Sequence, residues 1–286
     1  MNSFFGIMFG FLAIILPLVS LIGWVFLFTR FFHYSREVFP KSIFLRGWGS
    51  TARYISLGLL PLFMSAASIV SASISIIFEL LVSIIVILIF SGGSNVTLLT
   101  VTMSAGPIEE SAKLLCAGLL YMTVYLIWRK RPEMSKERNR VKDGLLIGLI
   151  AGASFGLLES VLYLFAGFDI FMNQPISLFT VDPILWRFVL GVSIHALYTG
   201  IASAGLGRSS FRSKVAYTLI FLPVAVVLHS LNNGVQGFFI YVLDMDGTAG
   251  LIIIDILQIL LILIGCGVFI LLWKMAGKGR TSKEKW

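Results

Sequence analysis

The chain has 286 residues, of which 58% are hydrophobic and only 13% are charged, and its net charge is +8. Soluble domains carry about 25% charged residues, and a mean hydropathy of +0.96 is too high for a surface that faces water. These values exclude a soluble enzyme, a disordered chain and a nucleic-acid-binding protein. The apolar runs are continuous rather than alternating, which predicts an all-α, polytopic helix bundle in a membrane and not a β-barrel.

The first apolar run, residues 1–28, has neither a basic n-region nor a small-residue cleavage site before Arg30. It predicts a first spanning helix, kinked at Pro17, rather than a cleaved signal peptide. The next run, 54–90, is longer than one untilted span requires. It is interpreted either as one broken helix or as a span joined to an in-membrane or surface segment. Five further runs have the length of a single span: 106–128, 142–166, 184–206, 214–242 and 250–273.

The distribution of Lys and Arg sets the expected topology. Of the 22 basic residues, 20 lie in the segments 30–53, 129–142, 207–214 and 274–286. The intervening loops 91–105, 167–183 and 243–249 carry none. By the positive-inside rule, the four basic segments are cytoplasmic. The N-terminus is then outside and the C-terminus cytoplasmic. We therefore expect about seven transmembrane helices in a multi-pass protein of the cell membrane, and eight only if 54–90 crosses twice.

We expect one membrane domain with three parts. Residues 1–105 would supply N-terminal transmembrane segments and a cytoplasmic basic loop. Residues 106–242 would form a four-helix core that carries the chemistry. Residues 243–286 would form the last transmembrane helix and a basic cytoplasmic tail.

Ionisable side chains at membrane depth are expensive and are therefore candidates for a functional site. In the run 106–128, Glu109 and Lys113 are four residues apart, so they share a helix face and can pair. Glu110 points to a different face, and Pro107 suits the first turn of the helix. The alternative interpretation is a helix N-terminus whose acids complement the helix dipole.

In the run 142–166, Glu159 lies well inside the apolar segment and has no basic partner in its own helix. Phe155 precedes it by one helical turn. A repeat of small residues on the neighbouring face predicts close contact with another helix. That repeat consists of Gly144, Gly148, Gly152, Gly156 and Ser160. The alternative for Glu159 is a protonated side chain that donates a hydrogen bond to a neighbouring helix.

Two later runs carry histidine. Arg187 and His195 lie in 184–206, while His229 and Asn233 share a face in 214–242. The alternatives are a histidine that only completes the packing, for His195, and an interhelical hydrogen-bond ladder, for His229 and Asn233. Counted at about 1.5 Å per residue from the expected outer boundaries, the polar side chains of four helices all fall between the outer surface and about the midplane. Three other polar residues lie in apolar runs without a second acid or base at motif spacing: Glu79, Asp255 and Gln258.

Four segments, in this order on successive helices, resemble the PrsW family of intramembrane proteases, which is related to the CAAX prenyl endopeptidases. They are EESAK (109–113), FGLLESVLY (155–163), R-x7-HALYTG (187–200) and HSLNN (229–233). The superfamily pattern is a double glutamate followed by a basic residue, then F-x-x-x-H, then H-x-x-x-N or D. Here Glu159 replaces the first of these histidines, as in the PrsW branch. The match covers about 106–236, and no single motif is specific.

The resemblance implies a glutamic-type endopeptidase that cuts a membrane-anchored protein near the extracytoplasmic face. Glu109 would activate a water, helped by Glu159 or His195. His229 and Asn233 would stabilise the oxyanion, which fits the need of peptide hydrolysis for a base and for aimed donors. The implied catalytic set is Glu109, Glu110, Glu159, His195, His229 and Asn233, supported by Lys113, Phe155 and Arg187.

The same resemblance implies no metal and no other cofactor, and membrane-anchored anti-sigma factors as the substrate class. The expected partners are thus a membrane-anchored protein and the lipid bilayer, without nucleic acid. Two alternatives remain open from the residues. His195, His229 and the glutamates suit zinc, although no H-E-x-x-H is present. The acids and histidines also suit a proton or ion relay in a transporter, although no internal repeat is evident.

Overall fold

The computed structural model describes residues 49–90, 94–129, 140–173, 190–208, 211–244 and 248–278, together with Ile15. The predicted first span with its kink at Pro17, most of the basic segments and Arg187 lie outside the described residues.

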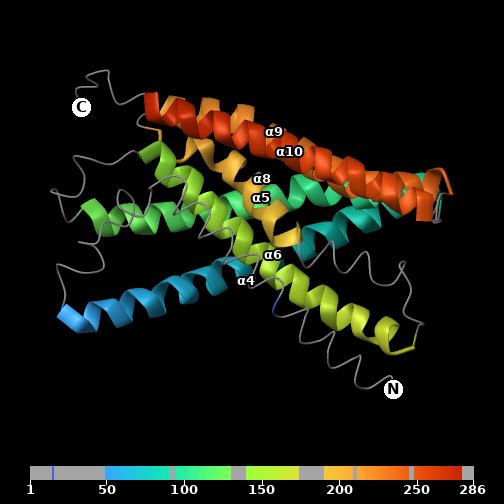
Figure 1. Ribbon diagram of the computed structural model, residues 1–286, viewed down its shortest axis with the longest axis horizontal. Helices are drawn as coiled ribbons and strands as arrows, with labels where there is room; N and C mark the ends of the chain where they lie inside the picture. The colour runs from blue at the N-terminus through green and yellow to red at the C-terminus, as the bar shows by residue number, and fades with distance from the viewer. Residues whose placement is uncertain are drawn as a thin grey trace.

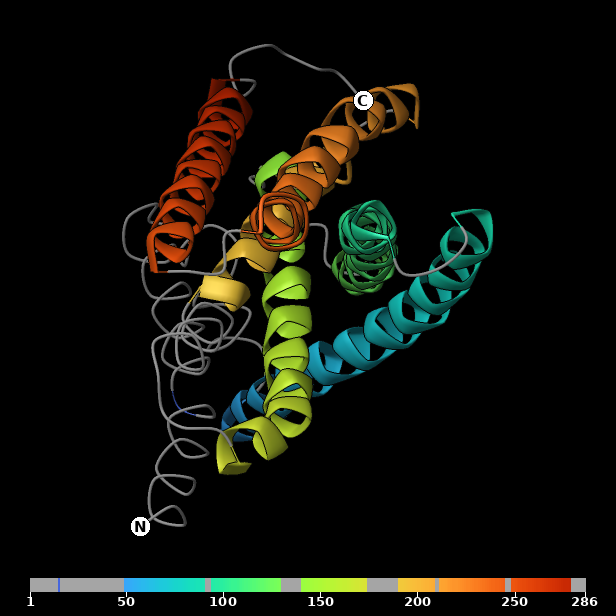
Figure 2. The ribbon, with the colours of Figure 1, turned by 90° about the vertical axis from the view of Figure 1, so that its right-hand side faces the viewer.

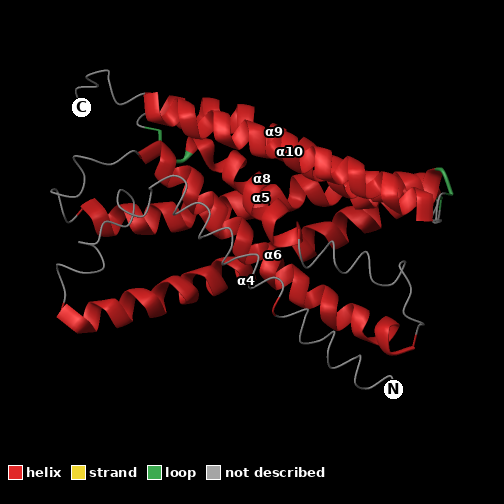
Figure 3. Cartoon of the chain, in the orientation of Figure 1, coloured by secondary structure: helices red, strands yellow, loops and turns green. Residues whose placement is uncertain are grey.

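All regular structure in the described part of the chain is helical (Figure 3). The helices are α4 (Gly49–Ile89), α5 (Asn95–Arg129), α6 (Arg140–Asn173), α8 (Val192–Ala202), α9 (Phe211–Gly237) and α10 (Thr248–Lys278). A 3-10 turn, η3 (Ser203–Gly205), follows α8, and a π-helical turn, η4 (Phe238–Val242), follows α9. The predicted all-α class is therefore confirmed.

Four of the described helical segments are long and apolar enough to cross a membrane: Ser68–Ile89, Val141–Tyr163, Phe211–Val242 and Thr248–Ala276. The run that begins at residue 54 forms one continuous helix of 41 residues, α4. The number of seven spans and the orientation of the termini stay predictions.

The helix α8 lies inside the bundle. All of its 11 residues are buried, and it packs against α6, α9 and α10 (Figure 1). The sequence predicted a spanning helix over 184–206. The structure describes a helix over Val192–Ala202, followed by η3, while residues 184–189 lie outside the described residues. A run that is apolar on all faces fits either a lipid-facing span or a buried helix, so hydropathy alone does not distinguish the two.

The predicted close contact of the glycine face of α6 is confirmed. A Cβ added at Gly152 would lie 2.1 Å from the backbone oxygen of His195, and one at Gly148 would lie 2.4 Å from Ser203 Oγ. Gly156 meets the His195 ring, where a Cβ would be 2.9 Å from Cδ2. The glycines thus let the backbone of α6 approach α8 and η3 at the turn that carries His195.

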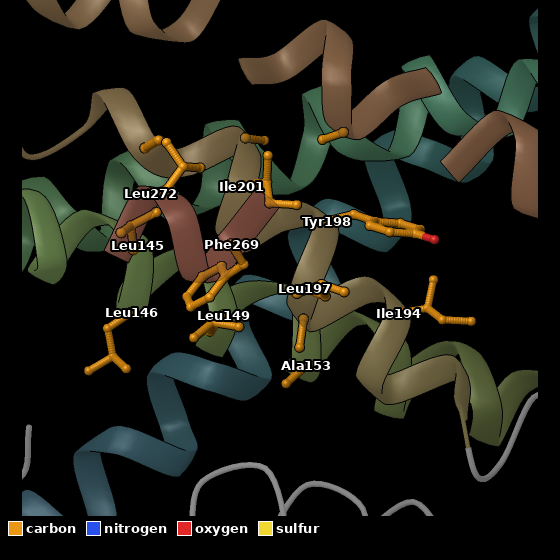
Figure 4. Packing of buried hydrophobic residues seen from close by; sticks show 14 of the residues in the cluster. Leu145, Leu146, Leu149, Ala153, Ile194, Leu197, Tyr198, Ile201, Phe269 and Leu272 are labelled. Carbon is orange, nitrogen blue, oxygen red and sulfur yellow. The ribbon is translucent and has the colours of Figure 1, made fainter. Parts of the chain in front are cut away.

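An apolar cluster holds α6, α8 and α10 together beside this contact (Figure 4). Leu145 and Leu149 of α6 pack against Leu197 and Ile201 of α8, and Phe269 of α10 completes the cluster. In the view of Figure 2, α10 and α4 lie on opposite sides of the bundle, with α5, α6 and α9 between them.

The helix α5 begins at Asn95 and places Pro107 in its interior, whereas the sequence predicted Pro107 in the first turn. Proline has no N–H for the carbonyl four residues earlier, which is that of Met103. Ser230 Oγ of α9 donates a hydrogen bond to this carbonyl at 2.9 Å. Gly106 makes room, since a Cβ there would lie 2.2 Å from Ser230 Oγ. The helix therefore continues through Pro107 because α9 supplies the missing donor.

The Gly152→Ala variant tests the contact between α6 and α8. The added methyl would meet a backbone oxygen rather than a flexible side chain, and such overpacking typically costs about 1–3 kcal/mol. We expect a clear fall in the thermal unfolding temperature in detergent. Gly267→Ala on α10 is the matched control, because nothing lies within 4 Å of its added Cβ. Equal unfolding temperatures for the two variants would contradict the contact.

Candidate functional site

A cluster of ionisable side chains lies buried where α5, α6, α8 and α9 meet. Glu109, Glu110 and Lys113 come from α5, and His195 and His229 come from α8 and α9. Glu159 of α6 borders the cluster and has a side chain that is 16% exposed. The structure thus brings together six of the residues that the sequence singled out.

Lys113 is the centre of the cluster. Its fully buried ammonium lies 3.2 Å from Glu109 Oε2 and 2.6 Å from Glu110 Oε1. It lies 2.9 Å from His195 Nδ1. An ammonium has three protons to donate, so these three acceptors use all of them. The Phe155 ring covers the charge at 4.5 Å from its centroid, a cation–π distance. The predicted pairing of Glu109 with Lys113 is confirmed.

Glu110 accepts three hydrogen bonds. Its Oε1 accepts from Lys113 and lies 2.8 Å from His229 Nδ1, and its Oε2 accepts from Thr199 Oγ1 at 3.0 Å. The side chain has no exposed surface. Thr199 was missed by the sequence analysis, although it follows His195 by four residues and so shares its helix face.

Glu109 is less constrained than Glu110. Its Oε2 accepts from Lys113, and it lies 3.6 Å from His195 Nδ1 and 3.7 Å from His229 Nε2. These last two distances exceed those of hydrogen bonds. Its side chain keeps 6% of its surface exposed. Glu109 therefore faces both histidines and remains able to accept a further proton donor.

The hydrogen bonds of His195 assign its tautomer. Its Nδ1 accepts from Lys113, and its Nε2 contacts Glu159 Oε2. A neutral imidazole that accepts at Nδ1 carries its proton at Nε2, so His195 donates to Glu159. Glu159 and Lys113 thus hold opposite edges of the same ring.

The two histidine rings stand edge to face, with centroids 5.1 Å apart and planes at 74°. His229 turns Nδ1 toward Glu110 and Nε2 toward Glu109. One ligand atom each from Glu109, His195 and His229 lies within 4.8 Å of the others. Carboxylate and imidazole are donors that zinc takes, so this is the described group best suited to a metal ion.

A small polar cavity opens beside the histidines. Its volume is about 20 Å³, which is room for about one water molecule. Its polar lining consists of His195, His229, Asn232, Asn233, Gln236 and Gln258. Asn233, predicted in the oxyanion site, is therefore a cavity residue and only partly buried.

Three polar cavity residues were not among the predicted site residues: Asn232, Gln236 and Gln258. Asn232 is buried, and its Oδ1 has no hydrogen-bond partner among the described residues. Gln258 of α10 donates from Nε2 to the backbone oxygen of Asn232 at 3.0 Å. Spacing gave no signal for Gln258, because its neighbours in the site come from another helix.

The model of the family described as PrsW family intramembrane metalloprotease matches residues 57–264. A stretch of 103 residues is 34% identical to "Protease PrsW" of Halalkalibacterium halodurans. This alignment covers 35% of the chain and 41% of that relative, so the chain spans less than half the length of the curated protein it matches. No solved structure matches the chain. Because the family match extends over well more than half of the residues and includes every helix of the site, the chain belongs to the PrsW family of intramembrane proteases.

Proposed function

We propose that the protein is an intramembrane endopeptidase in which Glu109 activates a water that attacks a peptide bond of a membrane-anchored protein. The observation that carries this proposal is the buried Glu/His/His group beside a polar cavity with room for about one water molecule. His195 and His229 line the cavity, and both lie within 3.7 Å of Glu109. The two rings therefore border both the cavity and the carboxylate.

The two adjacent glutamates differ in their hydrogen bonds, and we assign them different roles on this basis. A general base needs a lone pair directed at the proton it removes. Both oxygens of Glu110 already accept hydrogen bonds, from Lys113, His229 and Thr199. Glu109 has fewer partners and some exposed surface, so it takes the role of base. Glu110 instead fixes the orientation of His229.

His229 and Asn233 are the proposed oxyanion donors, since both line the cavity. Donors held in place before the reaction stabilise the charge that develops on the carbonyl oxygen. Asn233 offers its amide N–H. His229 keeps Nδ1 on Glu110, so Nε2, which faces Glu109, is the ring nitrogen left for the oxyanion.

The proposed substrate is a membrane-anchored protein cut near the extracytoplasmic face. The position of the cut follows from the expected orientation of the helices, in which the site lies in the outer half of the membrane. Membrane-anchored anti-sigma factors are the substrate class that the resemblance to PrsW proteins implies.

The family description raises the question of a metal. Glu109, His195 and His229 have suitable donor atoms, but the Nδ1 lone pair of His195 already accepts from the Lys113 ammonium. The same ammonium bonds Glu109. The group as arranged therefore does not fit a divalent cation, and the proposed mechanism uses none. A zinc-dependent hydrolase is the second candidate, because the three donors are clustered, but it requires Lys113 to leave two of them.

Glu109→Gln is expected to abolish cleavage, because the amide cannot accept the proton of water. Loss of a general base typically lowers a rate by about 10² to 10⁴-fold. The measurement compares membrane and secreted proteins, with mapping of new peptide termini, from cells that express either form. A membrane protein whose shed ectodomain appears only with the wild type would be the substrate and would locate the cut.

The control for this experiment is Glu79→Gln, which changes a partly buried acid on α4 that does not belong to the Glu/His/His group. It should cleave as the wild type does. Glu110→Gln should instead lower the unfolding temperature, because it removes the charge that pairs with buried Lys113, a change of about 3–5 kcal/mol. Unchanged termini with Glu109→Gln, at equal amounts of folded protein, would refute the proposed base.

Glu159→Gln tests whether this carboxylate acts through His195. The amide still accepts from Nε2 but no longer carries a charge beside the ring. We expect kcat for the identified substrate to fall roughly 10- to 100-fold with little change in KM, and the pH dependence of kcat to shift. Tyr163→Phe, one turn further along α6 and half exposed, is the control. A purely structural role for Glu159 would leave the pH profile in place.

A further inference from the structure

The buried carboxylates of the site require a cation beside them. Glu109 and Glu110 are both almost completely buried, and an unpaired buried charge costs several kcal/mol. A protein meets this need either with a bound metal ion or with a cationic side chain. The described part of this chain places Lys113 there, with Nζ between the two carboxylates.

The ammonium bonds atoms that a metal ion would use. Of its three acceptors, Glu109 Oε2 and His195 Nδ1 belong to the Glu/His/His group. Ligands of tetrahedral zinc, at 2.0–2.2 Å from the ion, lie roughly 3.3–3.5 Å apart. Glu109 Oε2 lies 3.6 Å from His195 Nδ1 and 3.7 Å from His229 Nε2. Two of the three distances are thus close to those of a zinc site, but the lysine holds two of the three ligand atoms.

His195 has no second lone pair to offer a metal. Its Nε2 contacts Glu159, so turning the ring to present the other nitrogen would break that contact. Lys113 is equally fixed, because it has no exposed surface and the Phe155 ring lies over it. Two cations a few ångströms apart also repel each other strongly at the effective dielectric of a protein. Ammonium and metal therefore exclude each other.

We propose that Lys113 is the resident cation of this site, standing where a divalent metal would bind, and that removing its charge creates a zinc site of Glu109, His195 and His229. Metal content reports on this site whether or not the protein cleaves a peptide. A failure here is therefore distinguishable from a failure of the proposed protease activity.

The test measures zinc in the full-length protein, purified in detergent, equilibrated with Zn²⁺ and freed of unbound metal. The wild type should retain none at this site, and Lys113→Met should retain about one Zn²⁺ per chain. Zn²⁺ should raise the unfolding temperature of Lys113→Met and not that of the wild type. Lys113→Arg keeps the charge and should bind no zinc.

Two controls locate the metal. Lys142→Met removes a lysine that lies over the Trp273 ring, outside the cluster, and should behave as the wild type does. The double variant Lys113→Met, His229→Ala should lose the zinc that the single variant gains.

Two results would overturn the proposal. In the first, the wild type retains zinc and the Glu109→Gln variant does not. Zinc would then bind at Glu109 in the presence of Lys113, so the two cations would not exclude each other. In the second, a folded Lys113→Met binds no zinc. A Lys113→Met that folds only with zinc supports the proposal. If Lys113→Met does not fold at all, the zinc content of the wild type decides. Zinc that is present in the wild type and absent from Glu109→Gln overturns the proposal, and a wild type without zinc supports it.

Discussion

The ammonium of Lys113 connects the three helices α5, α6 and α8 electrostatically. It pairs with two adjacent carboxylates of α5, and it fixes His195 of α8, which in turn contacts Glu159 of α6. Because Glu110 also holds His229, α9 joins the same network. In a medium of low dielectric such bonds are strong when complete and costly when broken. The cluster therefore fixes the mutual register of the helices as well as the chemistry.

Two backbone contacts place this network. The glycine face of α6 allows α8 to approach so closely that the backbone at His195 lies against Gly152. On the other side, Ser230 of α9, the neighbour of His229, packs against Gly106, which precedes Pro107 on α5. The Ser230 hydroxyl donates a hydrogen bond to the carbonyl that proline leaves without a donor. Each histidine thus sits beside a close helix contact. Small displacements of α8 or α9 would change the distances from Glu109 to both rings.

Sequence reasoning succeeded where the residues that carry the pattern lie within one helix. The spacing of Glu109 and Lys113 predicted their pairing, and the glycine repeat predicted a close contact for α6. It failed where a partner comes from another helix. Pro107 suggested a helix start because the donor that lets the helix continue, Ser230, is more than a hundred residues away.

The same limit explains the missed residues of the site. Thr199 and Gln258 gain their significance only through Glu110 and Asn232, on other helices. The burial of α8 was missed for a different reason, because an apolar run fits lipid and protein interior equally well. Family motifs indicated which residues to expect in the site, but their distances depend on how the helices pack.

The double glutamate illustrates why packing matters for chemistry. Two identical side chains, adjacent in sequence, differ in their hydrogen bonds: Glu110 accepts three, while Glu109 keeps some exposed surface and faces two imidazole rings. A carboxylate whose oxygens are all occupied serves as a fixed counter-charge, whereas one with an open lone pair can take a proton from water. Their difference arises from Thr199 and His229, which approach Glu110 alone within hydrogen-bond distance. Helix packing therefore gives two adjacent glutamates different surroundings.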